Sequence, residues 1–470
     1  MFLGWIQNGN WSEAKNWWTV QDNYGFFHVY AFTMTLGVIL AVGVSAIKLY
    51  RKGVPLTELW IGAAAIVPLS LFGASFFGKL NANGIGQNAG GASFFGLFAF
   101  WEGGMAIHGG VYTGTFFGVI IFYFLSKRTK VSLWVYADAI IPNILLGQAV
   151  GRWGNFFNHE IFGMPVAEWN NGNTSALNWL PNFIRTNMVW TYTGDGEKLN
   201  GLTLERGHDY LMSPIFLYEA FGLLLAWILI TFVIANIGKW FGKKPDYLIE
   251  KKVNNKNISL KVKFADFWFD IKKIFNKNLR NTESNSNLIK TANWKIWKNE
   301  VYANHKYKEI DLYKEQVNNI SDKNYFVRKW KQGKLLSDCN NPQKYMLIRS
   351  GVQAGSYFFA WNLVRFVLEL GRPDDHLFLM YQRTLSLTII GLSMFVGLAI
   401  ALLSQFVFPY LFRTTGLIYE QEYFYVEKGA GIVKQIKPKK ESKTKISKIE
   451  KNKIKEQRIK EKLDKKLGKK

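Results

Sequence analysis

Four short polar motifs lie within or beside long apolar segments, and they contain the residues best suited to chemistry. Ionisable groups are unfavourable inside a membrane, so such positions are functional-site hypotheses by default. In chain order, the motifs span residues 101–110, 151–163, 213–219 and 365–374. Their cations, carboxylates, amides and imidazoles suit the binding of an anionic, phosphate-bearing substrate.

The motif at residues 151–163 combines a fixed cation with two amides and a carboxylate. The guanidinium of Arg152 can donate two parallel hydrogen bonds to a phosphate, and Asn155 and Asn158 can donate to phosphate or glycerol oxygens. A structural alternative also fits the motif, in which Arg152 pairs internally with Glu160 in a polar turn. The first interpretation predicts a headgroup site just beyond the fourth apolar segment.

His108 stands between two glycine pairs at the start of the third apolar segment. Glycine lets a ligand approach the backbone closely, and histidine can take or relay a proton near neutral pH. The alternative is a histidine that forms only a structural hydrogen bond at the start of a helix.

Arg365 and Glu369 are four residues apart in the sixth apolar segment, so a helix would place both on one face. They could form a structural ion pair or belong to a binding site. Glu219 lies in the fifth apolar segment and needs a cationic partner, for which Arg152 or Arg365 is the natural candidate. A phosphate held between these two arginines, with His108 nearby, would suit a reaction at a phosphodiester or glycerol carbon.

Seven runs of predominantly apolar residues are long enough to cross a hydrocarbon core about 30 Å thick. They span residues 28–48, 56–77, 106–126, 132–150, 214–238, 347–370 and 384–410. Basic residues follow the first, third, fifth and seventh runs, which by the positive-inside rule places these ends in the cytoplasm. The sequence therefore predicts an all-α integral membrane protein with about seven transmembrane helices, its N-terminus outside, its C-terminus cytoplasmic and a small extracellular head.

The expected domains follow from these runs. They are an outer N-terminal arm at 1–27, spans one to four at 28–150, the extracellular head at 151–213, span five at 214–238, a cytoplasmic basic insertion at 239–346, spans six and seven at 347–412 and a cytoplasmic Lys-rich tail at 413–470.

The formal net charge of +25 resides mostly in two blocks, 239–345 and 426–470, outside the apolar runs. Cationic blocks beside membrane spans are typical of the cytoplasmic face and interact with anionic lipid, so nucleic acid is not the expected partner. The single cysteine, Cys339, excludes an internal disulfide. The histidines are scattered without metal-ligand spacing. We therefore expect neither a metal nor an organic cofactor, and a thiol in the chemistry would come from the substrate.

At these motifs the chain resembles the prolipoprotein diacylglyceryl transferase family. The family signature G-R-x-G-N-F-x-N-x-E-x-x-G is complete at residues 151–163. The other matching residues are the histidine block at 103–110, Pro214 with Tyr218 and Glu219, the block at 365–369 followed by Arg372, and His28, Val29 and Tyr30. The resemblance covers roughly residues 24–230 and 347–412.

Two positions depart from the family pattern. Ala31 replaces the glycine that usually follows the tyrosine, so Tyr24, which precedes a glycine, is the rival of Tyr30. The second apolar run lacks the family's arginine near residues 73–75.

The resemblance implies transfer of diacylglyceryl from phosphatidylglycerol to the lipobox cysteine thiol of a prolipoprotein, with release of glycerol phosphate. It implies catalytic roles for His108, as base or proton relay, and for Arg152 and Arg365, as phosphate ligands. The substrate-binding residues that it implies are Tyr30, Asn155, Asn158, Glu160, Gly163, Glu219, Glu369 and Arg372. The active site would lie near the outer leaflet of the cell membrane, with phosphatidylglycerol, the lipobox segment and membrane lipid as partners.

Two other classes remain compatible with the apolar runs. A multi-span membrane transporter would also carry intramembrane charges, but it should show internal repeat symmetry, and no repeat is evident. A lipid-binding tether without transferase activity would explain the basic tail, but it would not need the outer polar cluster.

Overall fold

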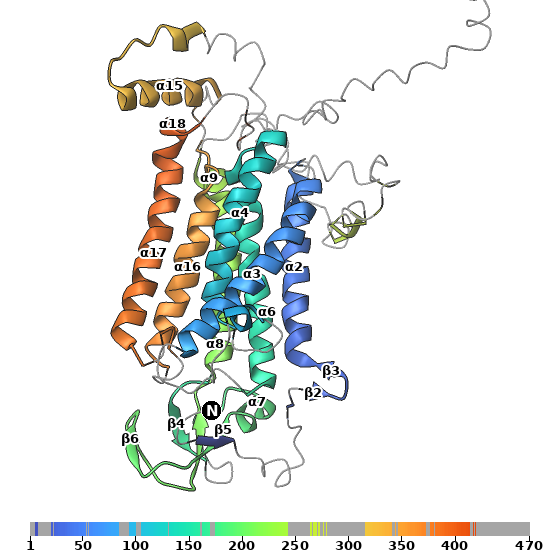
Figure 1. Cartoon of the computed structure of the whole chain (residues 1–470), viewed down its shortest axis with the longest axis vertical. Coiled ribbons are helices and arrows are strands. Elements are labelled where there is room, and N and C mark those ends of the chain that lie inside the picture. Colours follow the sequence, from blue (N-terminus) through green and yellow to red (C-terminus); the bar gives the residue numbers. More distant parts are fainter. Residues whose placement is uncertain are drawn as a thin grey trace, which may run out of the picture. The chain divides into compact units, whose positions relative to one another are not determined.

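The computed structural model shows long helices that run side by side, with a small head of strands and turns at one end (Figure 1). It describes residues 5–7, 20–83, 94–99, 105–242 and 315–419, with short gaps inside these ranges, and scattered residues between 264 and 279. The chain divides into two units, Met1–Tyr425 and Val426–Lys470, and all described residues belong to the first.

Six helical segments in the described part of the chain are long and apolar enough to cross a membrane. Four of them lie within single helices: α2 (Val29–Arg51), α3 (Thr57–Asn83), α4 (Ile107–Thr129) and α17 (Arg383–Phe406). The fifth consists of α5 (Leu133–Ile140) and α6 (Ile144–Phe157), which are joined by the turn Ile141–Asn143. The sixth is α8 (Ile215–Ile228), which continues through the turns Leu229–Val233 and Ile234–Asn236 into α9 (Ile237–Phe241). The molecule is therefore a multi-pass membrane protein.

The predicted sixth span corresponds to α16 (Val352–Glu369), which is not among those six segments. Its buried polar residues, which include Asn362, Arg365 and Glu369, lower its hydropathy. α16 nevertheless packs tightly along α17, because a Cβ added at Gly355 would lie only 2.4 Å from the Ala401 backbone nitrogen. A count of seven spans thus depends on α16 and remains a prediction.

Small residues let neighbouring helices approach backbone to backbone, as expected for packing inside a membrane. A Cβ at Gly37 of α2 would lie 2.5 Å from the carbonyl oxygen of Gly147 in α6. A Cβ at Gly114 of α4 would lie 2.3 Å from the Ser70 hydroxyl of α3. These contacts leave no room for a side chain, and the first of them fixes α6, the helix that ends with the 151–157 part of the polar motif, against α2.

The head contains strands, which departs from the predicted all-α fold. Its four-stranded sheet has the order β1-β5-β8-β4 with antiparallel neighbours, formed by Trp5–Gln7, Val189–Tyr192, Asp209–Met212 and Pro165–Glu168. The other head elements are the hairpin β6–β7 (Glu197–Leu199 and Leu202–Leu204) and the short helix α7 (Asn182–Thr186). A further hairpin, β2–β3 (Asn23–Tyr24 and Phe27–His28), precedes α2. Strand β5 has the sequence Val-Trp-Thr-Tyr, and β-branched and aromatic residues of this kind favour a strand.

The head shares its hydrophobic core with the ends of two membrane helices. Phe156 of α6 and Phe216 of α8 are both buried in this core, and their rings stack with centroids 4.7 Å apart. Arg152 lies one turn before Phe156, and Glu219 lies one turn after Phe216. The core therefore holds these two ionisable residues at a fixed separation.

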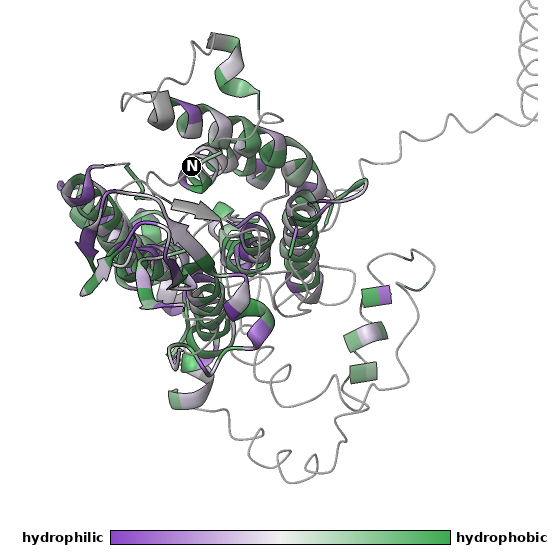
Figure 2. Ribbon diagram, turned by 90° about the horizontal axis from the view of Figure 1, so that it is seen from below, coloured by the Kyte–Doolittle hydropathy of each residue, from purple (hydrophilic) through white to green (hydrophobic). Residues whose placement is uncertain are grey.

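The fourth span is longer than predicted, because α6 continues to Phe157 instead of ending near residue 150. Arg152 and Asn155 consequently lie in the last turns of a membrane helix and not in a loop beyond it. Hydrophobic residues dominate the helices, whereas hydrophilic residues gather in the head (Figure 2).

Candidate functional site

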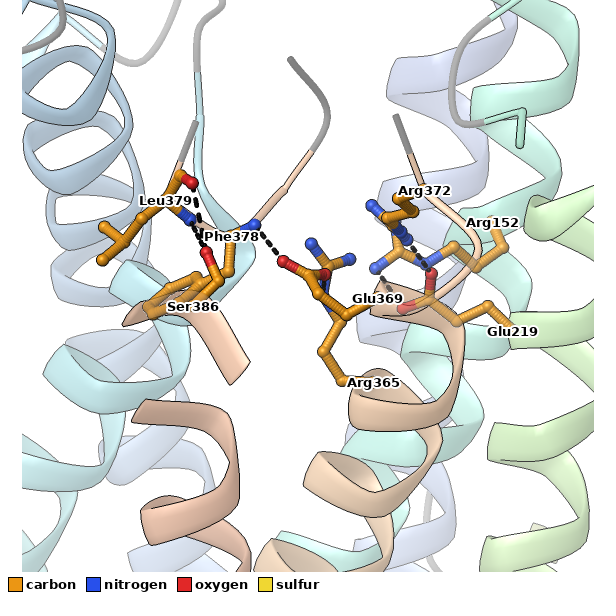
Figure 3. Close-up of polar contacts among 8 residues, drawn as sticks. All are labelled: Arg152, Glu219, Arg365, Glu369, Arg372, Phe378, Leu379 and Ser386. Carbon is orange, nitrogen blue, oxygen red and sulfur yellow. Dashed lines mark hydrogen bonds and ion pairs between the residues drawn. The ribbon is translucent and has the colours of Figure 1, made fainter. Parts of the chain in front are cut away.

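Glu219 is the centre of a buried ion-pair network at the head end of the helices. Its Oε1 lies 2.8 Å from Arg152 Nη2, and its Oε2 lies 2.8 Å from Arg372 Nη2. The carboxylate and both guanidinium groups are almost completely shielded from solvent, with Glu219 only 1% exposed. Figure 3 shows the three side chains converging from α6, α8 and the segment that follows α16.

A second ion pair lies on α16 beside the first network. Arg365 Nε is 3.0 Å from Glu369 Oε2, so the shared helix face predicted from the four-residue spacing is confirmed, and the two side chains form an ion pair. The other carboxylate oxygen of Glu369 accepts a hydrogen bond from the Phe378 backbone N–H. In Figure 3, Arg365 lies between Glu369 and the Arg152–Glu219–Arg372 network. The Arg365–Glu369 pair and the Arg152–Glu219–Arg372 network therefore form one charge cluster.

Hydrogen bonds hold the described part of the segment after α16 beside this cluster. The guanidinium of Arg383 donates to the Leu370 carbonyl at 3.2 Å and to the Arg372 carbonyl at 2.9 Å. The Leu379 N–H donates to the buried Ser386 hydroxyl at 2.7 Å. These bonds hold the chain so that Arg372 points toward Glu219 and Phe378 toward Glu369.

The cluster carries an excess of positive charge. Among the described residues, three arginines (Arg152, Arg365 and Arg372) face two carboxylates (Glu219 and Glu369), so the described groups carry one more cation than anion. All five side chains are buried, and no residue of the cluster is more than 7% exposed. A buried charge without a counter-ion is strongly unfavourable. The arrangement is thus suited to receive one anionic group.

The sequence identified one partner of Glu219 and missed the other. Arg152 was one of the two expected candidates, and the structure confirms it. The second partner is Arg372 instead of Arg365, because α16 directs Arg365 to Glu369 one turn further along the same helix. Spacing along the chain could not show that the segment after α16 folds back toward α8.

His108 lies in the first turn of α4, in an aromatic enclosure. It is 3% exposed, and its ring centroid is 4.6 Å from that of Trp361 and 4.4 Å from that of Phe378. Within the described part of the chain, its Nε2 has no hydrogen-bond partner. The three cluster arginines act on it electrostatically. The alternative of a purely structural histidine hydrogen bond through Nε2 therefore has no support among the described residues.

The remaining expected site residues lie around the end of α6. Asn155 Oδ1 accepts a hydrogen bond from Arg152 Nη1 at 3.2 Å, and Asn158 ends the helix, its N–H donating to the Gly154 carbonyl. Tyr30 packs against Gly154, whose added Cβ would lie 3.0 Å from the tyrosine ring. The side chain of Tyr30 therefore lies beside the signature motif.

Three further expectations concern Tyr24, Gly163 and Glu160. The rival tyrosine, Tyr24, lies in the β2–β3 hairpin and is partly exposed. Gly163 has a packing reason to be glycine, because its N–H donates to the Ser213 carbonyl at 2.7 Å and an added Cβ would lie 3.0 Å from the Ser213 side chain. Glu160 lies outside the described residues, so the alternative Arg152–Glu160 pair has no structural description.

Comparison with known proteins places this cluster in a family context. Residues 24–245 match the family model described as Prolipoprotein diacylglyceryl transferase. The chain is 32% identical over 254 residues to a protein of Mycoplasmoides gallisepticum and 32% identical over 211 residues to one of Malacoplasma penetrans, which covers 46% and 41% of this chain and 62% and 53% of those relatives. A protein of Streptococcus equi subsp. equi is 31% identical over 224 residues, which is 47% of this chain and 70% of the relative. All three relatives are named phosphatidylglycerol–prolipoprotein diacylglyceryl transferase.

The chain belongs to the prolipoprotein diacylglyceryl transferase family. It spans about 60% and about half of the length of the two mycoplasma-type relatives that it matches. The family match at 24–245 contains His108, Arg152 and Glu219, whereas Arg365 and Arg372 lie beyond its end. The structure joins the two parts, because both ion-pair networks meet at one site.

Several buried polar or aromatic residues that lie near the site were not predicted from the sequence. Gln148 of α6 donates to the Tyr357 hydroxyl at 3.5 Å, and Asn362 of α16 is fully buried one turn before Arg365. Both are amides in apolar runs, which is a signal that the sequence offered. Trp361 and Phe378 gave no such signal, because aromatic residues are common in membrane helices. Among the described residues, no group of three His, Cys, Asp or Glu side chains could hold a metal ion.

Proposed function

We propose that this chain transfers the diacylglyceryl group of phosphatidylglycerol to the cysteine thiol of a prolipoprotein lipobox. Family membership and the relatives' names support this activity. The observation that carries the proposal is the buried cluster of three arginines and two glutamates, in which the residues that the structure describes have one cation in excess. A phosphate diester carries one negative charge and would balance that excess.

The proposed phosphate site lies between the guanidinium groups of Arg152 and Arg365. Arg365 uses its Nε toward Glu369 Oε2, and its guanidinium lies beside the Arg152–Glu219–Arg372 network (Figure 3). Arg152 is held by Glu219 and Asn155, which fixes the plane of its guanidinium. A preorganised guanidinium can stabilise negative charge as it develops on a leaving group without rearranging.

The proposed reaction is a displacement at the glycerol carbon that bears the phosphate. The substrate thiol loses its proton to a base, and the resulting thiolate attacks this carbon, because the thiolate is the competent nucleophile. A carbon–sulfur bond forms, the carbon–oxygen bond to the phosphate breaks, and glycerol phosphate leaves with the bonding electron pair. His108 is the proposed base or proton relay, since its Nε2 is free of described hydrogen bonds and lies near the arginines.

The proposed topology has seven spans, with α16 as the sixth, the N-terminus and head outside and the C-terminus in the cytoplasm. Support comes from the basic residues Lys48, Lys127 and Arg128, which lie at helix ends away from the head. In this orientation the charge cluster lies near the outer leaflet. Labelling of Asp195→Cys on intact cells, in a Cys339→Ser background, tests it, because the Asp195 side chain is fully exposed in the head. Labelling that requires permeabilised cells would reverse the assigned orientation.

A direct transfer assay tests the activity. The full chain in vesicles that contain phosphatidylglycerol is mixed with a lipobox peptide, and mass spectrometry detects the thioether-linked product. Arg152→Lys keeps the charge but loses the two-pronged donor geometry, so transfer should fall at least tenfold, a loss of about 1.4 kcal/mol or more in transition-state stabilisation.

Arg349→Lys is the matched control for that variant. Arg349 is also a buried arginine of the helical part, but it bonds Ser337 and the region of α15, away from the cluster. Its replacement should leave the transfer rate per folded molecule nearly unchanged. Equal rates for the wild type and a well-folded Arg152→Lys variant would contradict the phosphate site, and a wild type without product would contradict the activity.

A further inference from the structure

The helix α15 (Tyr325–Asn340) lies across the ends of α17 and α18 (Phe408–Leu411), at the end of the bundle opposite the head (Figure 1). A Cβ added at Gly333 would lie 2.0 Å from the Tyr410 carbonyl oxygen, so the two backbones are in direct contact. The rings of Trp330 and Tyr410 have centroids 4.8 Å apart. Arg349 Nη2 donates to the Ser337 hydroxyl at 2.7 Å. α15 is therefore docked on the bundle through one face.

The docked face continues beyond the bundle as exposed apolar surface. Residues 326, 330, 333 and 337 follow one another at intervals of four, three and four, so they lie on one side of the helix. Gly333 and Ser337 are buried, Trp330 is half-exposed, and Phe326 is 70% exposed. Tyr325 and Val327 add exposed apolar surface beside Phe326. Figure 1 shows this N-terminal half of α15 projecting past α17.

The lipid-facing surface of α17 leads directly to this projecting half. Phe395, Leu402 and Phe406 of α17 are all exposed, as membrane-facing side chains must be in a multi-pass protein. Phe406 is 62% exposed, and Phe412, just after α18, is 66% exposed. The apolar surface thus reaches the level of Tyr410, where α15 crosses. The side of α15 that contacts Tyr410 therefore faces the bundle end where the apolar surface of Phe406 and Phe412 is exposed.

The charges of α15 identify the kind of lipid. The helix carries Arg328, Lys329, Lys331 and Lys334 against a single acidic residue, Asp338. Lys329 and Lys334 lie on either side of the face marked by Phe326 and Trp330, where long basic side chains can reach headgroup phosphates while their stems stay apolar. Lys331 lies on the far side and pairs with Asp322 at 2.9 Å.

We infer that the N-terminal half of α15 is an interfacial helix that binds anionic phospholipid in the leaflet at this end of the bundle. Phe326 inserts among the lipid chains, and Lys329 and Lys334 contact the phosphates. This combination of apolar anchors and basic flanks is how amphipathic helices bind anionic membranes. The proposed orientation makes this leaflet the cytoplasmic one. α15 lies outside the region matched by the family, and this inference does not depend on transferase activity.

Spin-label depth measurements test the inference on the full chain in vesicles. In a Cys339→Ser background, Phe326→Cys and Lys331→Cys each receive a nitroxide label. The label at 326 should collide with oxygen several-fold more, relative to a water-soluble nickel complex, than the label at 331 does. The label at 326 should also lie deeper in vesicles that contain phosphatidylglycerol than in phosphatidylcholine alone. Equal water exposure at the two positions, or protection at 326 by a second copy of the chain in place of lipid, would overturn it.

A charge-reversal variant supplies the second arm. Lys329→Glu combined with Lys334→Glu should abolish the difference at position 326 between the two lipid compositions. The label at 331 serves as the control, since it should report water in every case. Thermal unfolding in detergent, compared with the wild type, shows whether the charge-reversed variant is folded. A lipid dependence that persists after charge reversal would refute the role of the two lysines.

Discussion

The two ends of the helical bundle handle buried charge in opposite ways. At the head end, Glu219 and Glu369 face three arginines, and one positive charge is left over. At the other end, the buried carboxylate of Asp138 in α5 accepts hydrogen bonds from the N–H groups of Gly351 and Ala354, each at 2.9 Å. Asp138 therefore caps the first turn of α16, where a negative charge is favourable.

α16 connects these two ends. Comparing the buried charges at its two ends distinguishes a structural role from a functional one. The charge at its start is matched by backbone donors, so it has a complete structural explanation. The described charges near its other end include one more cation than anion, which is the basis for proposing that an anionic substrate binds there. Burial of an ionisable group is thus not enough to indicate a functional site, whereas an uncompensated charge is a stronger indication.

The largest effect is expected from removing the central carboxylate of the cluster. Glu219→Gln leaves Arg152 and Arg372 without their carboxylate, so the excess rises from one cation to two. Breaking a buried ion pair costs about 3–5 kcal/mol of folding stability. Thermal unfolding in detergent should show a large loss, and transfer should be abolished.

Glu58→Gln is the matched control for that substitution. Glu58 is also a buried carboxylate with an arginine partner, but Arg128 is 58% exposed, so the pair resembles a surface pair worth at most about 1 kcal/mol. Its replacement should change unfolding little and leave transfer intact. Equal destabilisation by the two substitutions would contradict the larger contribution to stability that we expect from the buried cluster.

Removal of the imidazole at the cluster should slow the reaction without unfolding the protein. His108→Gln keeps much of the side-chain size between Trp361 and Phe378 but cannot accept a proton. General acid–base catalysis contributes about 100-fold to 10,000-fold, so kcat should fall by that order while KM for the lipid changes little. A raised KM with unchanged kcat would assign His108 to headgroup positioning instead.

At the opposite end, loss of charge should affect stability alone. Asp138→Asn keeps one acceptor oxygen and replaces the other with an NH2 group that cannot accept, so one of the two backbone N–H groups at the start of α16 loses its partner, at a cost of about 1–3 kcal/mol. The 18 residues of α16 separate this site from Glu369 by roughly 27 Å at 1.5 Å per residue. The transfer rate per folded molecule should therefore stay near that of the wild type. A strong loss of transfer in the folded variant would show that the two ends are coupled through α16.

The sequence could predict the parts of the fold and site that depend on local pattern. Apolar runs located the membrane helices, although some of their ends differ by several residues, and the four-residue spacing of Arg365 and Glu369 predicted that both lie on one face of a helix. The end of α6 was missed because Arg152 and Asn155 read as loop residues, although the buried network satisfies them inside the helix. Polar residues can extend a membrane helix when residues elsewhere in the fold pair with their side chains.

The remainder depends on long-range contacts that spacing does not encode. Arg372 reaches Glu219 only because the chain after α16 folds back, and Phe378 reaches His108 for the same reason, whereas Trp361 contacts His108 from within α16. The sheet in the head also joins strands far apart in sequence, as β1 and β5 show. Short strands between Asn- and Gly-rich turns give only a weak signal in a single sequence.

The smallest effect is expected in the exposed head, and it is a pH dependence of stability. His208 Nδ1 lies 2.8 Å from Glu168 Oε1 on the surface, and this hydrogen bond to the carboxylate raises the pKa of His208 above its ordinary value. A raised pKa in the folded state means that folding favours the protonated imidazole. The resulting stabilisation is fully present below the unfolded pKa of about 6.5 and is lost as the pH rises through the folded value.

Because both side chains are exposed, water and salt screen the pair, and its contribution should be far smaller than that of the buried cluster. His208→Gln removes the titrating group while keeping a hydrogen-bond donor toward Glu168. The unfolding temperature of the variant should fall slightly below that of the wild type at about pH 5.5 and match it at about pH 8.5, on the two sides of the ordinary histidine pKa. At either pH the variant should transfer at the same rate as the wild type, because the substitution changes no charge in the cluster. A variant less stable than the wild type only at the higher pH would contradict the sign of this linkage, and an effect as large as that of Glu219→Gln would contradict the distinction between screened and buried charge.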